Sequence, residues 1–252
     1  MARKKTLIGG VHPAVLAVWA ALQAACHMLP AVVLLGVGGT MSVANSIIPL
    51  GGVFFGPVGG ALTGSIGQII GFMINPSGAW LGAFTFLLGT STGFVAGLLA
   101  QGKWPLAYAL NALGIAIFYL FPVGRVAWIK GVTFGVAGLI TCLVGGIFAK
   151  KYITSKNAVL KFISLWTCCT GALLTTCMFA DNANIIISSP PAITMKMMAF
   201  ISPGERFTFG LGSAIIGTPL LYGLPKIGIM VGPRSPEELA DFTDEEADEL
   251  DD

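Results

Sequence analysis

The sequence is poor in charged residues, which a soluble protein needs on its surface. Only 10% of its 252 residues are Asp, Glu, Lys or Arg, whereas 55% are hydrophobic. A soluble domain carries roughly 25% charged residues, so this chain has too few to cover a surface that faces water. Its mean hydropathy is +0.83. We therefore predict an integral membrane protein whose body is almost entirely embedded in a bilayer.

Negative charge is almost absent from the body of the chain. Ten of the 12 acidic residues lie between Glu237 and Asp252, so that only Asp181 and Glu205 precede this tail. The 14 basic residues all lie at or before Arg234. Because blocks of like charge stay solvated and disordered, we predict a disordered acidic tail over residues 233–252. A docking role for the tail is the alternative.

The chain also lacks the usual signatures of an enzyme, a metal site or a nucleotide site. It has two histidines, no HExxH motif and no serine or cysteine triad context. Its five cysteines fall in apolar segments without metal-ligand spacing, and the GK[ST] of a phosphate-binding P-loop is missing. We therefore expect no catalysis, no cofactor, no metal and no nucleic-acid partner. The energy for any uphill transport must come from a partner protein or an ion gradient.

Long apolar stretches predict several membrane-spanning helices. A span needs about 20 apolar residues, and the candidates are 14–37, 43–56, 57–74, 79–100, 105–122, 126–149, 157–180 and 208–231. The second and third stretches are short and meet at Gly56, so they could form a tight hairpin, a broken helix or one kinked span. The predicted fold is an all-α, polytopic bundle of about six to eight transmembrane helices over residues 14–232.

The basic residues predict how the chain is oriented. The basic N-terminus, residues 1–13, is expected in the cytoplasm by the positive-inside rule. If all the candidate segments cross, the loops with Lys103 and with Lys150, Lys151 and Lys156 are cytoplasmic, and so is the acidic tail. The basic residues expected outside are Arg125, Lys130, Lys196 and Arg206. We predict a multi-pass protein of the prokaryotic inner (plasma) membrane, in contact with lipid, with both termini in the cytoplasm.

Small residues recur at helical spacing in the first half of the chain. Glycines recur every four residues from Gly52 to Gly64, which indicates tight packing, because small residues let helices approach closely in lipid. Alanines recur in the same way at Ala17, Ala21 and Ala25 and form one stripe on a helix. This stripe is either an internal packing seam or a docking surface for another membrane protein's helices.

A family resemblance rests on longer runs. The stretch from Leu50 to Phe72 reads LGGVFFGPVGGALTGSIGQIIGF and is followed by NPSGAWLGAFTFLLGTSTGFVAGLL. These runs resemble the substrate-binding S components of energy-coupling factor (ECF) transporters, which carry runs of the form GxLFGPxxGALVGALxDLLG and GLIxGLL. The segment ISPGERFTFGLGSAIIGTPLLYGLPKIG is similar to their final span, and the alanine stripe matches the AxxxA pattern of their first helix. The chain departs from the family at Gln68, where the pattern often has Asp.

The resemblance implies a function and a set of partners. It implies a membrane-embedded subunit that captures a vitamin-like small molecule from outside the cell for an ABC-type importer. The alanine stripe would contact the transmembrane coupling (T) subunit, which two ATPase subunits drive. Because the family usually has six spans, the extra pair is most simply an inserted helical hairpin at about 105–148. Such an insertion preserves the topology, since it adds an even number of crossings.

Polar residues are scarce within the predicted spans, and several are expected to gather on the outer side. A small-molecule site needs an apolar or aromatic wall and a few fixed hydrogen-bonding groups. An aromatic ring could stack a flat ligand while amides and a carboxylate fix its polar edge. The predicted substrate-binding residues, which lie where the resemblance also implies the ligand, are Asn45, Asn75, Trp80, Asp181, Asn182 and Asn184.

Each of these residues also has a structural interpretation. Residues 181–184 could simply end the seventh span at the interface. Asn75 could be a turn residue and Trp80 a member of the interfacial aromatic belt. The neighbouring charges Glu205 and Arg206 could be loop charges. Interhelical hydrogen bonds, rather than ligand contacts, are the expected role of His27, Gln23 and Gln68.

The predicted function is therefore that of an ECF-type substrate-capture subunit. The alternative is a non-transporting structural or accessory subunit of a larger membrane complex, built on the same fold. The extra hairpin, the acidic tail and Gln68 motivate it. An ion-coupled carrier is weaker, since the sequence shows no repeated half and no evident charged pair at mid-membrane.

Overall fold

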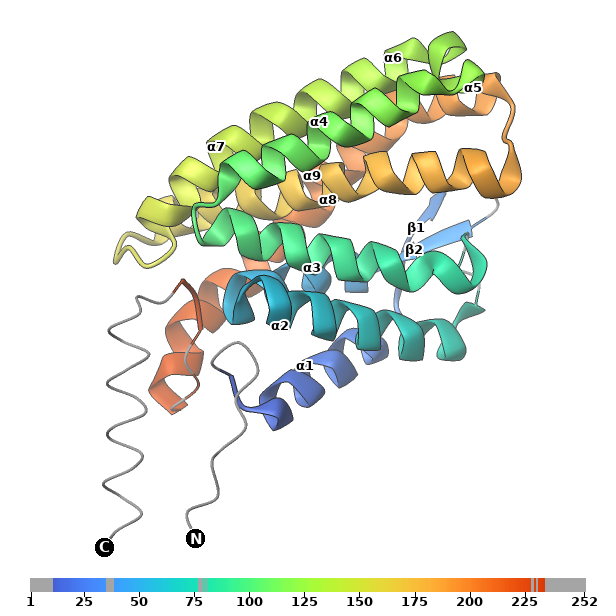
Figure 1. Ribbon diagram of the computed structural model, residues 1–252. Helices are drawn as coiled ribbons and strands as arrows, with labels where there is room; N and C mark the ends of the chain where they lie inside the picture. The colour runs from blue at the N-terminus through green and yellow to red at the C-terminus, as the bar shows by residue number, and fades with distance from the viewer. Residues whose placement is uncertain are drawn as a thin grey trace, which may run out of the picture.

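The computed structural model describes residues 11–34, 39–76, 79, 81–227, 229 and 231–233, and most of them are helical (Figure 1). The elements in chain order are α1 (Pro13–Cys26), β1 (Pro30–Leu34), β2 (Gly39–Ser42), α2 (Ala44–Ile74), η2 (Gly82–Thr85), α3 (Phe86–Ala100), α4 (Trp104–Leu120), α5 (Pro122–Val126), α6 (Trp128–Lys130), η3 (Gly131–Val136), α7 (Ala137–Tyr152), α8 (Ala158–Ser188), α9 (Ala192–Gly223) and η4 (Leu224–Ile227). The helix η3 is a π-helical turn that joins α6 to α7.

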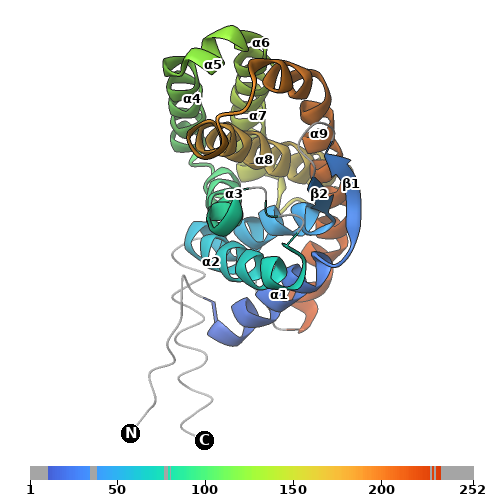
Figure 2. The same cartoon turned by 90° about the vertical axis from the view of Figure 1, so that its right-hand side faces the viewer.

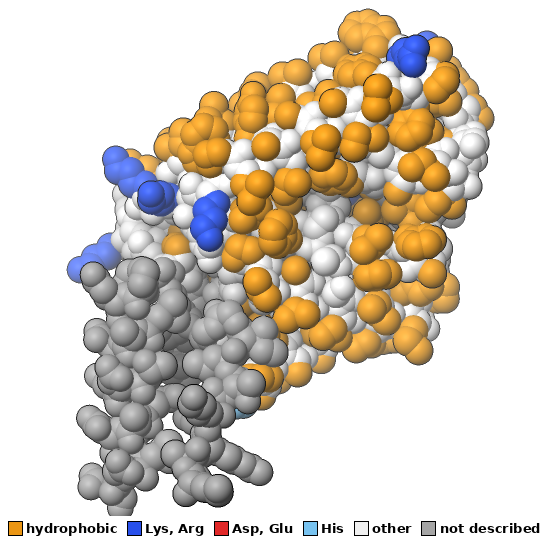
Figure 3. All heavy atoms as spheres, viewed as in Figure 1, with side chains coloured by type: hydrophobic (Ala, Val, Ile, Leu, Met, Phe, Trp, Pro, Cys, Tyr) orange, Lys and Arg blue, Asp and Glu red, His pale blue; other side chains and the backbone are white. Residues whose placement is uncertain are grey.

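The surface and the helix lengths are those of a membrane protein. Within the described residues, five helical segments are long and apolar enough to cross a membrane. They are Ala44–Ile74, Gly82–Ala100, Trp128–Tyr152, Ala158–Ser188 and Ala192–Lys226. Figure 3 shows hydrophobic side chains spread over the visible face, with the visible Lys and Arg side chains near its two ends. A soluble protein rarely exposes so broad an apolar surface, and the prediction of a helical membrane protein is confirmed.

The element α2 is a helical hairpin. Gly56 has φ 75° and ψ −178°, which lies outside the helical region. Gly52 and Gly60 would be about 12 Å apart along the axis of a continuous helix. They lie so close together that a Cβ on Gly60 would overlap the Gly52 backbone. The chain therefore turns back at Gly56, and residues 44–55 and 57–74 form two helices that fold onto each other. Of the three arrangements open to this segment, the structure has the tight hairpin.

The first predicted span is wrong in its second half. Helix α1 ends at Cys26, and the chain continues as the antiparallel strands β1 and β2, so the described chain is not wholly α-helical. Pro30, the first residue of β1, has no N–H to donate to a continuing helix. Two valines follow it, and β-branched residues favour strands. The last span also differs, because α9 begins at Ala192 rather than near residue 208.

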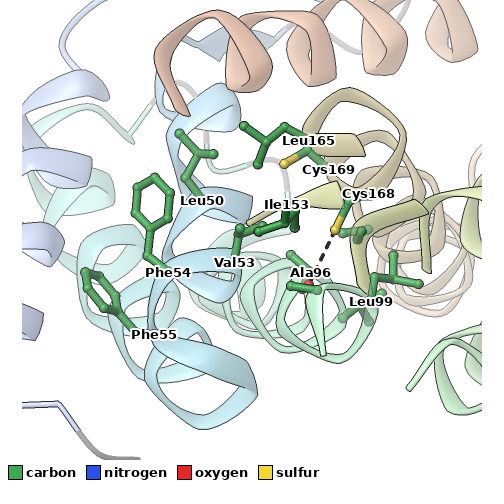
Figure 4. Close-up of a cluster of buried hydrophobic side chains, with 14 of the residues drawn as sticks. Leu50, Val53, Phe54, Phe55, Ala96, Leu99, Ile153, Leu165, Cys168 and Cys169 are labelled. Carbon is green, nitrogen blue, oxygen red and sulfur yellow. Dashed lines mark hydrogen bonds between the residues drawn. The ribbon is translucent and has the colours of Figure 1, made fainter. Parts of the chain in front are cut away.

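The largest hydrophobic core lies where α2, α3 and α8 meet. Figure 4 shows side chains from these helices converging there, among them Leu50, Ala96 and Leu165, which are completely buried. The thiol of Cys168 donates to the carbonyl oxygen of Ala96 at 3.6 Å. Lipid tails are as apolar as these side chains, so close packing, rather than escape from water, holds such helices together in a bilayer.

The helices α4 to α7 form a unit on one side of the bundle. In both ribbon views they lie along α8, away from α1 (Figures 1 and 2). Asn111 of α4 donates its Nδ2 hydrogen to Oγ1 of Thr175 in α8 at 3.0 Å. Asn182 of α8 donates from Nδ2 to the carbonyl oxygen of Gly114 at 2.9 Å. The hairpin expected at about 105–148 occupies this unit, which leaves α1 uncovered.

Candidate functional site

A polar cavity lies among the ends of several helices. It has an interior volume of about 50 Å³, and its walls come from the end of α1, from β2, from both helices of α2, and from α3, α8 and α9. Polar side chains in its wall include His27, Asn45, Gln68, Asn75, Thr176 and Arg206. These residues are far apart in the sequence, so the cavity exists only because the helices assemble around it.

Three buried polar side chains, those of His27, Gln68 and Arg206, meet at this cavity and are only 8%, 9% and 7% exposed. The side chains of His27 and Gln68 interact with each other, whereas Nε of Arg206 has no hydrogen-bond partner in the described chain. A buried polar group without a partner costs about 1–3 kcal/mol, and a charged group costs more. Buried polar side chains from three distant segments, one of them with an unpartnered atom, distinguish this cavity as the candidate binding site.

Hydrogen bonds hold one rim of the cavity in place. Oγ of Ser42 and Nδ1 of His27 are 3.1 Å apart. Asn75 donates from Nδ2 to the carbonyl oxygen of His27 at 3.1 Å, and Asn45 donates from Nδ2 to the carbonyl oxygen of Ser42 at 3.1 Å. These bonds join the end of α1 to β2 and to both ends of α2. They also fix the imidazole of His27, whose side chain interacts with Gln68 as well.

The cavity lies towards one end of the bundle. His27 follows α1, Asn75 follows α2, and Thr85 directly precedes α3, and Figure 1 shows these three helix ends on the right. The α3–α4 connection carries Lys103, and the α7–α8 connection carries Lys156 directly after Lys150 and Lys151 in the last turn of α7. Both connections lie on the left in Figure 1. The candidate site and the lysine-rich connections are therefore at opposite ends.

The predicted substrate-binding residues fall into three groups. Asn45 and Asn75 line the cavity. Asp181, Asn182 and Asn184 are buried within α8, but they are not part of the cavity wall. They do not end a helix, because α8 continues to Ser188. The sixth residue, Trp80, lies outside the described residues.

Asp181 forms a buried ion pair instead. Its Oδ1 is 2.6 Å from Nζ of Lys130, and the two side chains are 4% and 0% exposed. The ammonium group also contacts the sulfur atoms of Met195 and Met198 at 3.3 and 3.7 Å. Lys130 is the third residue of its helical segment, near one end of the bundle, and its pairing with Asp181 was not predicted from the sequence. The helical segment from Trp128 to Tyr152 carries Lys130 into the bundle.

The cavity also contains residues for which the sequence suggested other roles. Arg206 was open to interpretation as a loop charge, but it lies within α9 and lines the cavity. His27 and Gln68 form the interhelical hydrogen bond expected of such residues, and both also line the cavity. One signal pointed to Arg206, since it is a charged residue in a mostly apolar segment that follows Ala192. Ionisable residues in such segments are functional candidates.

A second recess is larger but has little polar chemistry. It has a volume of about 430 Å³, lies beside α3, α4 and α8, and is lined mostly by apolar residues such as Phe84, Phe94 and Phe179. Its hydroxyl groups are those of Thr90 and Ser91. Because a specific small-molecule site needs fixed polar groups as well as an apolar wall, the polar cavity is the better candidate.

Helix α1 exposes its alanine stripe. Ala17, Ala21 and Ala25 are all exposed, together with Val18 at 71% and Leu22 at 44%. The buried residues of α1 are Leu16, Trp19, Ala20, Gln23 and Ala24. Within this chain, the stripe is therefore not an internal packing seam.

Comparisons with known proteins give little information on function. No family model and no solved structure matches the chain. A protein of Methanocaldococcus jannaschii described as "Uncharacterized protein MJ0923" is 32% identical over 77 residues. The match covers 31% of this chain and 26% of that protein, so the chain spans about a quarter of the relative it matches. The fold and the surface define a polytopic helical membrane protein, and its function has to be argued from the site.

Proposed function

We propose that this protein is the membrane-embedded substrate-capture subunit of an ECF-type importer and that it binds a vitamin-like small molecule in the polar cavity. The observation that carries the proposal is the convergence of three buried polar side chains, from His27, Gln68 and Arg206, on one cavity, with Nε of Arg206 unpartnered in the described chain. The run that resembles the family, Leu50–Phe72, lies within the α2 hairpin. Both helices of that hairpin supply cavity wall.

The distribution of lysines supports an orientation suited to capture from outside. Connections that carry lysine are retained in the cytoplasm, and the α3–α4 and α7–α8 connections share one end of the bundle. The cavity lies towards the other end and would therefore be reached from outside the cell. In this orientation the described chain begins and ends in the cytoplasm.

The exposed alanine stripe supports a helical partner. Small side chains allow two helices to approach closely within lipid, and Ala17, Ala21 and Ala25 offer such a surface on α1. The unit formed by α4 to α7 lies on the other side of the bundle and leaves this surface uncovered. The proposed occupant is the T subunit, which two ATPase subunits drive.

Ligand retention by the purified full chain tests the proposal. Mass spectrometry of the extracted protein is expected to reveal a bound small molecule, and Gln68→Leu is expected to weaken its binding at least about tenfold, since a lost hydrogen bond in a buried site costs at least about 1.4 kcal/mol. The matched control is Gln101→Leu, because Gln101 ends α3 at the opposite end of the bundle. Equal binding by both variants would place the ligand elsewhere.

The buried pair of Lys130 and Asp181 favours a second candidate, an ion-coupled carrier, because buried ionisable residues often belong to ion pathways. Uptake of the retained ligand by cells distinguishes the two. Loss of uptake with an inactive partner ATPase supports the importer, whereas loss on collapse of the ion gradient alone supports the carrier. A stable large assembly with neither ATPases nor ligand would instead support the structural subunit.

A further inference from the structure

Arg206 is a buried cation that forms no salt bridge with the described residues, although Asp181 lies within electrostatic reach. Its side chain lies in the cavity wall, the residue is only 7% exposed, and its Nε has no hydrogen-bond partner in the described chain. Nη1 donates to the sulfur atom of Met41 at 3.1 Å, and the guanidinium also hydrogen-bonds the side chain of Cys177, but thioether and thiol sulfurs are weak acceptors. Among the described residues, the guanidinium therefore has sulfur partners, and its Nε has none.

The carboxylates near Arg206 do not neutralise it. Asp181 makes its ion pair with Lys130, so its charge is already balanced at short range. Glu205 precedes Arg206 on α9, and neighbouring residues of a helix point in directions about 100° apart. Within the described chain, neither carboxylate forms an ion pair with Arg206. Lys130, Asp181 and Arg206 together carry one net positive charge, and Glu205, whose Oε2 is buried without a hydrogen-bond partner in the described chain, forms no salt bridge that would neutralise it.

We infer that Arg206 binds a carboxylate or phosphate group of the ligand, an inference that rests on the proposed binding function. The planar guanidinium matches the two oxygens of these groups, and arginine is the residue best suited to such pairing away from water. Bound oxygens would also give Nε the partner that it lacks. An anionic ligand would thus neutralise the charge of Arg206 and accept the hydrogen bond that its Nε can donate.

The size of the cavity agrees with a compact anionic group. Each water-sized group needs about 10–15 Å³ of such volume, so the 50 Å³ here offers room for only a few heavy atoms. Pockets that enclose a whole drug-sized ligand usually measure about 300–1,000 Å³. In this conformation the cavity therefore has room for the carboxylate or phosphate group of a ligand. The cavity would have to widen to hold the rest of a vitamin-like molecule.

The test uses the purified full chain with three probes at constant ionic strength: sodium acetate, inorganic phosphate, and acetamide as the neutral counterpart of acetate. Thermal unfolding is followed by tryptophan fluorescence. We expect the unfolding temperature to rise with the concentration of acetate or phosphate until it reaches a plateau, and not to rise with acetamide. Whichever anion binds more tightly identifies the ligand group as a carboxylate or a phosphate. Arg206→Gln is expected to weaken this binding at least about thirtyfold. Arg206→Lys, which keeps the charge, is expected to weaken it less.

The matched control is Arg125→Gln, because Arg125 is exposed and its guanidinium donates to the carbonyl oxygens of Tyr119 and Leu120. It is expected to respond to the anions as the unmodified protein does. Equal responses to acetate and acetamide, or anion binding unchanged in both Arg206 variants, would overturn the inference. If the protein retains a neutral ligand whose binding depends on Gln68, and acetate and phosphate do not bind, the proposed binding function is supported and the inference of an anionic ligand is wrong. If the protein retains no ligand and binds neither anion, the proposed function and the inference are both wrong.

Discussion

The buried ion pair of Lys130 and Asp181 makes the sharpest prediction about stability. The 2.6 Å between Nζ and Oδ1 corresponds to a gross attraction of about 6 kcal/mol at an effective dielectric constant of about 20, and desolvation of both charges offsets part of it. Oδ2 of Asp181 has no hydrogen-bond partner in the described chain. Lys130→Met would therefore leave the carboxylate buried and unpaired, and we expect a loss of about 3–5 kcal/mol of unfolding free energy.

A double-mutant cycle measures this coupling. Lys130→Met, Asp181→Asn and the double variant are compared by reversible unfolding in mixed micelles titrated with sodium dodecyl sulfate. Because the double variant leaves no unpaired charge, we expect it to be at least about 2 kcal/mol more stable than the sum of the single losses predicts. Lys156→Met, at an exposed position, is the control and should change stability by less than about 0.5 kcal/mol. Additive single losses would refute the pairing.

Three further substitutions test the packing and the partner surface. Gly60→Val is expected to lower the free energy of unfolding by at least about 2 kcal/mol, because a Cβ there would overlap the backbone of Gly52 and Gly93; an unchanged free energy would contradict the hairpin. Gly56→Ala is expected to cost about 1–3 kcal/mol in the same assay, since its φ is 75°. Ala21→Trp should spare folding and ligand retention but abolish co-purification with a T subunit, and loss of ligand retention instead would count against a docking surface.

Much of the architecture was readable from the amino-acid sequence because it depends on composition and local spacing. The scarcity of charge required a membrane environment, and glycines at four-residue intervals from Gly52 to Gly64 indicated close helix contacts. Gly56 was recognised as a break, but three geometries of α2 stayed open. Local sequence marks where a chain can bend, whereas the angle between the two helices depends on what they pack against, here α3.

The alanine stripe is another feature that the sequence predicted in part and the tertiary structure completed. The spacing of Ala17, Ala21 and Ala25 placed them on one face of a helix, but whether that face is buried depends on helices far away in the sequence. Only the assembled bundle shows that the neighbouring face of α1 is buried and the stripe is exposed. The turn into β1 and β2 was missed because the apolar run from Ala14 to Val37 also suits a membrane helix.

The candidate site was the least predictable part. Asn45 and Asn75 were selected as scarce polar residues expected on the outer side of the membrane, and both line the cavity. Asp181 was selected as a ligand group, but it pairs with Lys130, which is 51 positions away in the sequence. A charged residue within an apolar segment can be recognised as important from the sequence. Its role, however, depends on which side chains of other helices lie beside it. Long-range contacts between helices, which no local pattern encodes, give Asp181 an ion-pair partner and leave Arg206 without one among the described residues.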